Sequence, residues 1–475
     1  MTTRASPLTL SGRAWSRVHC VGTGGMGLGP LAIFLAQSGC AVSGEDDAMS
    51  TEMRAQLRRA GVAIGGLPET CDLVVYSSAI APEHPALAAA RARGVPCARR
   101  GEVLAEAVRG RKLVAVCGSH GKTTTTAMLI TVLRRAGVPA GYVLGGLFND
   151  GGPPAAAGAC DWVVAEVDES DGTIGCFTPE ITVAVNLDWD HPDFYRSATE
   201  LETAFAALFA RTRGVVLVSD ACATSGRLAG SAAEAGRSGL TFGAGGDYRS
   251  ELAGDDGERM TLRLGGKFSV QQAHVRARGA FNAANATAAL AAADLIGAPL
   301  SGEELTGYAG VRRRQSVLST AGGVTVIEDY AHHPAEIRAL LGSLRRARPA
   351  GAGKLRVVFQ PHRFSRTAQF RAEFAAALAV ADAVYLLDVY PAGEAPVAGG
   401  TTSGVAAALR AAAPAVPVNY TEGDEEWSQR LSADVQRGDC VAFVGAGDIE
   451  RRAREWLAAR WEAWAAELGA KVTPA

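Results

Sequence analysis

The sequence predicts an α/β protein in which parallel sheets are covered by helices. Two observations carry this prediction. Short apolar runs alternate with Ala/Leu/Arg-rich stretches along almost the whole chain, which is typical of strands joined by crossover helices. The length of 475 residues favours about three domains of ordinary size.

Each predicted element follows from its pattern. Nine apolar runs read as strands: Arg17–Val21, Leu73–Tyr76, Leu113–Cys117, Trp162–Glu166, Ile181–Val185, Val215–Val218, Leu355–Gln360, Ala383–Leu387 and Cys440–Val444. Helices are predicted at Met26–Gln37, Lys122–Ala136 and Thr199–Ala210, and the tail from Glu450 to Ala466 is predicted to form a fourth, amphipathic helix. Alternating residues between Phe242 and Val275 indicate a small antiparallel side sheet. Breaks near Gly110 and Gly310 divide the chain into domains 1–110, 111–311 and 312–475.

Composition excludes several classes of protein. Charged residues make up 20% of the chain and the formal net charge is −2, which gives no electrostatic reason to expect a nucleic-acid or membrane partner. No stretch approaches the roughly 20 apolar residues of a membrane span. The nine scattered cysteines contain no C-x-x-C pair, which favours reduced thiols and a cytoplasmic location.

The first glycine-rich loop follows the strand that ends at Val21. It comprises Gly22, Thr23, Gly24, Gly25, Met26 and Gly27. Such a turn lets backbone N–H groups approach a diphosphate at a helix N-terminus, and Asp46 ends a strand about twenty residues later, where a dehydrogenase holds a ribose. The alternative is a tight strand–helix turn without a ligand. The loop alone does not decide which diphosphate compound it binds.

The second loop, after the strand that ends at Cys117, is more specific. It comprises Gly118, Ser119, His120, Gly121, Lys122, Thr123 and Thr124. Its backbone can cradle phosphates, Lys122 can reach the terminal phosphates, and the Thr123 hydroxyl can bind Mg²⁺. Val116 stands where a full Walker A motif has its first glycine. The alternative is a chance Gly-Lys-Thr at the start of a helix.

Acidic residues follow two strands of the central domain. Glu166, Asp168, Glu169 and Asp171 form one cluster, and the segment Asn186–His191 forms the second. Because the carboxyl ends of parallel strands meet at one sheet edge, these groups are expected beside the phosphate loop, where Mg²⁺ prefers oxygen ligands. Either cluster alone can be a solvated turn, but both together favour a metal–phosphate site.

Two more polar clusters follow strands in the last third. One is Glu328–Pro334, and the other is Phe359–Thr367. In the second, Arg363 and Arg366 can hold a small carboxylate by charge-assisted hydrogen bonds.

At this point the chain resembles the Mur ligases, and in particular their alanine-adding branch. The matching stretches are Gly22–Gly27, Val42–Asp46, Gly118–Thr125, Glu166–Asp171, Asp190–Tyr195, Gly279–Asn285, Asp329–Pro334, Gln360–Thr367, Tyr390–Glu394 and Gly445–Ile449. They span nearly the whole chain in the order found in the family, which is far more specific than one loop.

The resemblance implies an activity and a role for each domain. A Rossmann-like N-terminal domain would bind the UDP part of UDP-N-acetylmuramate through Gly22–Gly27 and Asp46. A central P-loop-type domain would bind ATP, and a Rossmann-like C-terminal domain would present L-alanine. The lactoyl carboxylate would become an acyl phosphate, which the amine of L-alanine attacks. The enzyme would work as a monomer or a homodimer.

The resemblance also implies roles for individual residues. Lys122, Glu166 and His191 would be catalytic, and Thr123, Glu166 and His191 would hold Mg²⁺, with Mn²⁺ as a substitute. ATP would contact the second loop and also Asn282, Asn285, Arg314 and Asp329. L-Alanine would contact His333, His362, Arg363 and Arg366.

Three positions depart from the family pattern. Phe281 stands where this branch often has His, and Gln315 stands where an aromatic residue is usual. No lysine lies between Lys122 and Lys267, so the carbamylated lysine of some Mur ligases cannot form in this stretch.

Other functions remain open from the sequence. The nearest are a ligase on the same scaffold that recycles a peptide onto UDP-N-acetylmuramate, and one that adds glycine or serine. An NAD-dependent oxidoreductase using Gly22–Gly27 leaves the Lys122 loop and the Glu166 acids unexplained. A non-catalytic nucleotide-binding regulator would bind ATP without releasing ADP.

Overall fold

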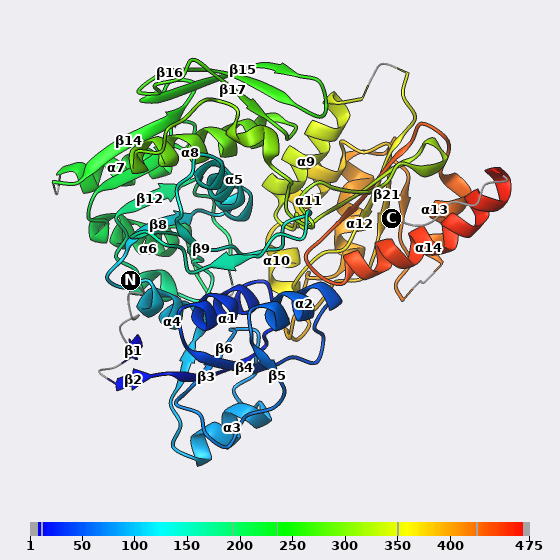
Figure 1. The fold of residues 1–475 in the computed structure, drawn as a ribbon. Helices are drawn as coiled ribbons and strands as arrows, with labels where there is room; N and C mark the ends of the chain where they lie inside the picture. Colours follow the sequence, from blue (N-terminus) through cyan, green and yellow to red (C-terminus); the bar gives the residue numbers. More distant parts are fainter. Residues whose placement is uncertain are drawn as a thin grey trace. The chain divides into compact units, whose positions relative to one another are not determined.

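The structure is a computed structural model that describes residues 8–10, 13–192, 194–234, 236–348, 351–423 and 426–468. These residues form two compact units. The first holds the chain up to Trp189 together with Phe194–Val311, and the second holds Asp190–Asp193 and the chain from Arg312 onward. Figure 1 shows the helices and strands that form them.

A five-stranded parallel sheet opens the first unit, with the strand order β5-β4-β3-β6-β7. Its strands are β3 (Arg17–Val21), β4 (Ala41–Glu45), β5 (Ala63–Ile64), β6 (Leu73–Tyr76) and β7 (Cys97–Arg99). Helices α1 (Leu28–Gln37), α2 (Thr51–Arg59) and α4 (Arg100–Ala107) pack on one face, and α3 (Pro85–Ala92) packs on the other. A short antiparallel pair, β1 (Leu8–Leu10) and β2 (Arg13–Trp15), precedes the sheet.

A ten-stranded sheet forms the rest of the first unit, in the order β10-β9-β11-β8-β12-β13-β14-β15-β16-β17. Its strands are β8 (Lys112–Cys117), β9 (Gly141–Val143), β10 (Ala155–Ala156), β11 (Trp162–Glu166), β12 (Ile181–Ala184), β13 (Val215–Ser219), β14 (Ser238–Gly243), β15 (Tyr248–Asp255), β16 (Met260–Gly266) and β17 (Gln272–Val275). The neighbouring strands from β9 to β15 in this order run parallel, whereas β10 is antiparallel to β9 at one edge and β15, β16 and β17 are antiparallel at the other. The antiparallel strands expected between Phe242 and Val275 are therefore present, but they extend the parallel sheet at its edge.

Helices cover both faces of this sheet. Helices α5 (Lys122–Arg135) and α8 (Ala280–Ile296) share a core with the β8 residues Val114 and Val116. Helix α6 (Ala198–Arg211) packs on the opposite face, and α7 (Ala223–Glu234) lies beside it. Seven of the eleven buried positions of α8 are alanine, so this helix approaches its neighbours closely.

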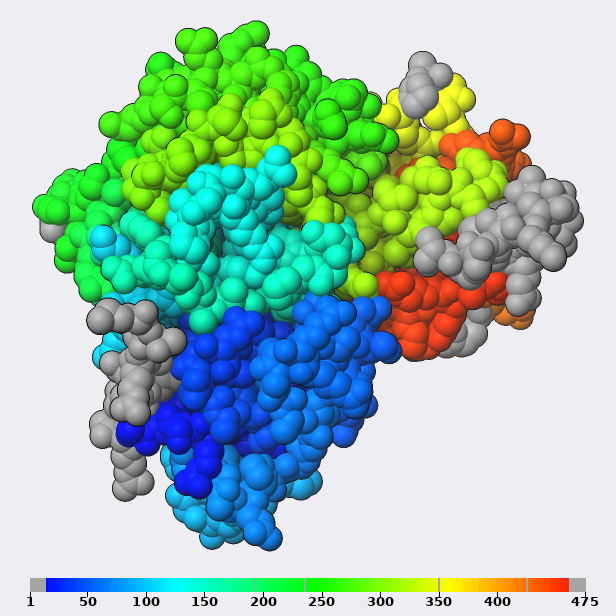
Figure 2. Space-filling model, in the orientation of Figure 1, coloured from blue at the N-terminus to red at the C-terminus, as the bar shows by residue number. Residues whose placement is uncertain are grey.

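The two sheets of the first unit are joined by side-chain contacts. Gln56 Nε2 of α2 donates to the carbonyl of Gly151 at 2.8 Å, and Ala157 N donates to Gln37 Oε1 of α1 at 3.0 Å. The blue and cyan surfaces meet at this junction in Figure 2. The N-terminal sheet is thereby fixed to the sheet that carries the second loop.

The second unit is built on a six-stranded sheet with the order β18-β19-β23-β20-β21-β22. Its strands are β18 (Ser316–Ser319), β19 (Thr325–Asp329), β20 (Leu355–Phe359), β21 (Ala383–Leu386), β22 (Val418–Asn419) and β23 (Cys440–Val444), and only β18 is antiparallel. Its helices are α9 (Pro334–Arg346), α10 (Phe364–Gln369), α11 (Arg371–Leu378), α12 (Thr402–Ala412), α13 (Trp427–Asp434) and α14 (Ile449–Leu468).

The predicted α/β fold is confirmed. All nine predicted strands are present with ends within one residue of those expected, and the four predicted helices end within two residues. Parallel sheets produce long uninterrupted apolar runs, which is why these elements are readable from the sequence. Among the described residues, no helix combines the length and the apolar character that crossing a bilayer requires.

Candidate functional site

The loop between β8 and α5 has the shape of a phosphate cradle. Gly118 has φ +124° and Gly121 has φ +81°, both in a region that favours glycine. A Cβ on Gly118 would lie 2.6 Å from the carbonyl oxygen of Asn186, and one on Gly121 would lie 2.6 Å from Asn285 Oδ1. Only glycine therefore fits at both positions, and Lys122 begins the helix directly after the loop.

Lys122 bends back over this loop. Its Nζ donates to the carbonyl of Gly118 at 2.7 Å and lies 3.0 Å from both carboxylate oxygens of Glu169. Glu169 is buried and Lys122 is largely buried, with exposed fractions of 1% and 11% for their side chains. Burial lowers the pKa of Lys122, but the carboxylates of Glu169, Asp168 and Glu166 outweigh it and raise the pKa above its ordinary value. The ammonium is therefore charged and held where a terminal phosphate would lie.

The hydroxyl of Thr123 and the carboxylate of Glu166 lie together beside Lys122. Thr123 Oγ1 donates to Glu166 Oε1 at 3.1 Å. Gly145 lies so close that a Cβ there would be 2.8 Å from the carboxylate carbon of Glu166. A hydroxyl and a carboxylate are hard oxygen donors, so this pair fits a Mg²⁺ ion shared with a phosphate.

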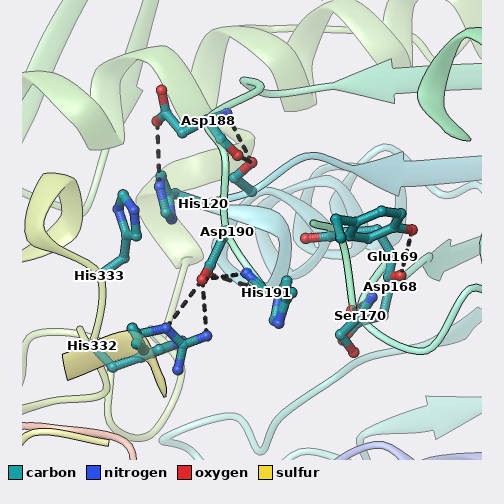
Figure 3. A network of polar contacts seen from close by, with 12 residues as sticks. His120, Asp168, Glu169, Ser170, Asp188, Asp190, His191, His332 and His333 are labelled. Atoms are coloured by element: carbon teal, nitrogen blue, oxygen red, sulfur yellow. Dashed lines mark hydrogen bonds and ion pairs between the residues drawn. The ribbon is translucent and has the colours of Figure 1, made fainter. Parts of the chain in front are cut away.

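The segment after β12 clamps the loop from one side. Asn186 exchanges hydrogen bonds with the backbone of His120, at 2.8 Å to its N–H and 2.9 Å to its carbonyl. Ser119 Oγ donates to the carbonyl of Asp188 at 2.6 Å, and the side chain of Asp188 lies 3.3 Å from His120 Nε2 (Figure 3). These contacts hold the loop in one conformation, in which the N–H groups of Ser119 and His120 are bonded to the carbonyl and the side chain of Asn186.

The N-terminal turn of α8 supports the loop from the other side. Thr125 Oγ1 of α5 donates to Asn285 Oδ1 at 3.2 Å, and Asn285 Nδ2 donates to Asn282 Oδ1 at 3.1 Å. Both asparagines are buried, and Asn285 closes on Gly121. The two predicted nucleotide residues of this helix thus lie against the base of the phosphate loop.

The first glycine-rich loop is tied to the strand beside it. The N–H groups of Gly22 and Thr23 both donate to the carbonyl of Glu45, at 2.9 and 3.2 Å. Asp46 accepts from Gly24 N at 2.9 Å and from Ala48 N at 2.8 Å. The carboxylate of Asp46 therefore holds the loop itself, whereas a dehydrogenase would use such an acid for a ribose.

The rest of this loop leads directly into α1. Gly25 N donates to the carbonyl of Gly22 at 3.1 Å, and Gly27 is the residue before the helix. Gly25 and Met26 are both exposed, and the exposed fraction of Met26 is 40%.

In the second unit, the ends of β19 and β20 bring together a buried polar cluster. Arg366 of α10 donates from Nε and Nη2 to Asp190 Oδ1, each at 3.0 Å (Figure 3). Its Nη1 lies 3.4 Å from His362 Nδ1, and the His362 ring stacks on Tyr390 with centroids 5.6 Å apart. His332 meets His362 edge-on at 5.9 Å.

The charges of this cluster are set by burial and by Arg366. Burial, assisted by His332 and Arg366, lowers the pKa of His362 to about 2. Burial and then Arg366 lower the pKa of His332 to about 3. Burial raises the pKa of Asp190, but Arg366 and the nearby histidines outweigh it and hold the pKa well below its ordinary value. At neutral pH, His332 and His362 are uncharged, and the negative charge of Asp190 balances the positive charge of Arg366.

The other predicted residues of the second unit have structural partners. Arg363, with φ +71°, donates to Glu394 at 3.2 Å. His333 accepts from Ala335 N at 3.3 Å and so caps α9.

Arg314 and Asp329 lie beside the start of β18. The guanidinium of Arg314 lies 5.1 Å from the ring centroid of Tyr330. Asp329 accepts from the backbone N–H groups of Gln315 and Ala331, each at 2.8 Å. Burial raises the pKa of Asp329 to about 6. The Gln315 position that departs from the family pattern thus contacts Asp329 through its backbone, and its own φ is +48°.

Sequence reasoning missed several residues that the structure places in these clusters. Glu169, the partner of Lys122, lies in the acidic stretch that begins at Glu166. Only its burial distinguishes it from the neighbouring acids, and burial of a single acid cannot be read from the sequence. Asn186 and Asp188 were noted only as polar strand ends. Asp190 and His332 lie next to predicted residues, and nothing in the local sequence distinguishes them from His191 and His333. His191 itself belongs to the second unit, where its N–H donates to Asp190 Oδ1 at 2.7 Å.

Three family models match consecutive parts of the chain. The model described as the Mur ligase family, catalytic domain, matches residues 17–112. The Mur ligase middle domain matches residues 116–293, and the Mur ligase glutamate ligase domain matches residues 313–447.

Curated proteins and solved structures give the same relationship over nearly the full length. The chain is 37% identical to the UDP-N-acetylmuramate–L-alanine ligase of Mycobacterium marinum, covering 93% of this chain and 94% of that protein. It is 39% identical to the same ligase of Mycolicibacterium vanbaalenii, covering 93% and 96%. The crystal structure of the UDP-N-acetylmuramate–alanine ligase of Thermotoga maritima matches with a TM-score of 0.76 at 27% identity, covering 94% of this chain and 99% of that one.

Proposed function

The chain belongs to the Mur ligase family, and from this premise we propose that it joins L-alanine to the lactoyl carboxylate of UDP-N-acetylmuramate while cleaving ATP to ADP. The observation that carries the proposal is the phosphate loop, in which the buried Lys122 lies over Gly118 and beside the Thr123–Glu166 pair. A cation, backbone donors and hard oxygens together are what transfer of a terminal phosphoryl group requires.

The first step is the transfer of that phosphoryl group to the substrate carboxylate. Lys122 exchanges its contact with Glu169 for one with the γ-phosphate and offsets the charge that develops there. The loop N–H groups bind the remaining phosphate oxygens, and Asn282 and Asn285 lie near the nucleotide. The proposed metal ligands are Thr123, Glu166 and His191, and a Mg²⁺ ion bound there supplies charge neutralisation during transfer.

The second step joins the activated carboxylate to the amine of L-alanine. The carboxylate of the amino acid binds Arg366, with His362, Arg363 and His333 nearby. The amine attacks the acyl carbon, the C–N bond forms, and phosphate leaves. His332 and His362 are weak bases because their pKa values lie at about 3 and 2, so the amine must lose its proton before it reaches them or to another acceptor.

Two further assignments complete the proposal. Residues Gly22–Gly27 and Asp46, in a domain comprising 1–110, bind the UDP moiety, ATP binds within 111–311, and 312–475 presents the amino acid. All nine cysteines are free thiols, which supports a reducing compartment such as the cytoplasm.

The alternative functions differ from the proposed one in the amine that is joined to the sugar or in the nucleotide that is bound. A peptide-recycling ligase would accept a peptide in place of L-alanine, and a glycine or serine ligase would prefer those amino acids. An NAD-dependent oxidoreductase finds no support in the comparisons, and it leaves the Lys122 loop and its Thr123–Glu166 pair unexplained.

The test is phosphate release by the purified chain with UDP-N-acetylmuramate, ATP, Mg²⁺ and L-alanine, leaving out each component in turn. We expect release only with the complete mixture and a product whose mass equals that of the UDP-sugar plus one alanine less water. A panel of glycine, serine and a cell-wall tripeptide in place of alanine tests the rivals. Faster turnover with any of these would overturn the assignment to alanine.

A further inference from the structure

Asp190 is held by the same side chain to which the amino acid is proposed to bind. Its Oδ1 accepts three hydrogen bonds, from Arg366 Nε and Nη2 at 3.0 Å and from the backbone N–H of His191 at 2.7 Å. The exposed fractions of the two side chains are 3% for Asp190 and 2% for Arg366. A buried ion pair with this many directed contacts keeps one geometry.

The contact with Asp190 uses one particular edge of the guanidinium. Nε and Nη2 form that edge, whereas Nη1 lies on the other side, 3.4 Å from His362 Nδ1. A guanidinium has five N–H donors in a fixed plane, so fixing one edge fixes the direction of the others. The Nη1 side is then held in a defined orientation, beside His362 Nδ1.

The surroundings of Arg366 supply no other negative charge at hydrogen-bond distance among the described residues. His362 and His332 are the ring neighbours, and Tyr390 stacks on His362. His191 Nε2 lies 3.8 Å from Asp190 Oδ2. Glu394 binds Arg363 and Ser365 rather than Arg366. Asp190 is therefore the group that both orients and balances this cation.

We propose that Asp190 is a positioning residue for the amino-acid substrate: by fixing the Nε–Nη2 edge of Arg366, it aims the Nη1 side at the carboxylate of L-alanine. This inference rests on the proposed function.

Asp190 lies on a short excursion of the chain from the first unit into the second. The chain leaves the first compact unit after Trp189 and returns to it at Phe194, so Asp190 sits on a short segment that joins the second unit. The orientation of Arg366 thus depends on a residue far away in the sequence.

The experiment compares D190N with the unsubstituted chain. Asparagine keeps the shape of the side chain but loses the charge, so we expect the KM for L-alanine to rise roughly ten- to hundredfold, as for loss of a charge-assisted hydrogen bond. The KM for ATP should not change. Hydroxylamine, a small nucleophile without a carboxylate, should still trap the acyl phosphate as a hydroxamate at a rate close to that of the unsubstituted chain.

Two further variants make the test specific. If Asp190 acts through Arg366, the KM for L-alanine of the double variant D190N/R366A should be no higher than that of R366A alone. The matched control is D439N, which breaks another buried Arg–Asp pair of the same unit, in which Arg356 Nε donates to Asp439 at 2.7 Å. D439N should lower the melting temperature but leave the KM for L-alanine unchanged.

The outcomes separate the inference from the function. If the unsubstituted chain forms no product with L-alanine, the proposed function fails and this inference fails with it. If that chain is active and D190N has an unchanged KM for L-alanine, only the role of Asp190 is overturned. Loss of hydroxamate formation in D190N also overturns it, because Asp190 would then serve folding or phosphoryl transfer.

Discussion

Replacing Lys122 by alanine should damage both stability and catalysis, and a second substitution should separate the two effects. Lys122 Nζ contacts both oxygens of Glu169 at 3.0 Å and the carbonyl of Gly118 at 2.7 Å. K122A removes these contacts, together with one to the carbonyl of Ser119 at 3.4 Å, and leaves the carboxylate of Glu169, whose side chain is 1% exposed, without its cation. The double variant K122A/E169Q removes that stranded charge as well.

The magnitude follows from the burial of the pair. Leaving one member of a buried ion pair uncompensated costs about 3–5 kcal/mol of unfolding free energy. For a unit of this size, that corresponds to a fall in melting temperature of roughly 10 °C. K122A/E169Q should recover most of this loss. Phosphate release should fall at least a hundredfold or so in both variants, because neither has a cation for the transferring phosphoryl group.

The assay pairs thermal unfolding followed by circular dichroism with phosphate release at saturating substrates. E169Q alone serves as the control for the loss of the acid. The reasoning is refuted if K122A keeps full phosphate release, or if K122A/E169Q is no more stable than K122A. The first result would remove Lys122 from the reaction, and the second would show that the pair is not the source of the stability.

Three further outcomes are expected. Mn²⁺ should support phosphate release in place of Mg²⁺, because Mn²⁺ accepts an imidazole ligand such as His191 more readily than Mg²⁺ does. Loss of turnover when Mn²⁺ replaces Mg²⁺ would contradict this. G118A should raise the KM for ATP and lower the melting temperature, because its Cβ would lie 2.6 Å from a backbone oxygen; an unchanged KM would show that the loop tolerates the side chain. Burial raises the pKa of Glu328 from 4.5 to about 7, so the folded state keeps a proton that the unfolded chain loses, and stability falls as pH rises from 4.5 to 7. E328Q should therefore gain about 3 kcal/mol at pH 8 and nothing at pH 4.5 in denaturant titrations; an equal effect at both pH values would count against the shifted pKa.

The fold could be predicted from the sequence because its strands are buried on both faces. Runs such as Leu113–Cys117 and Cys440–Val444 are apolar throughout, and each ends at a glycine that begins a loop. The joining of β14 to β15 could not be predicted, because only two residue pairs make that junction and no local pattern encodes it. Whether a hairpin extends a sheet or stands beside it is decided by contacts distant in the sequence.

The candidate site was predictable where one short motif holds all its parts, and less so where partners are far apart. The second loop, from Gly118 to Thr124, is such a motif. Glu169 and Asp190 lie 47 and 176 residues from the cations they bind, so no spacing rule finds them. Asp46 has the sequence position of a ribose ligand but binds Gly24, because a side chain of that length reaches the neighbouring loop backbone first.

Helix α8 suggests how nucleotide affinity can be altered in this chain without touching a contact residue. Its interior face is built mostly from alanine, a small side chain that forms helices well, and its second turn contacts the phosphate loop through Asn285. Because alanine has no side-chain rotamers, the distance between α8 and its neighbours can adjust little. An added methyl group on the buried side of α8 would overpack this core at a cost of about 1–3 kcal/mol, and a shift of the helix would reach the phosphate loop through Asn285. Variants with altered nucleotide affinity are therefore expected at these buried alanines as well as in the loop itself.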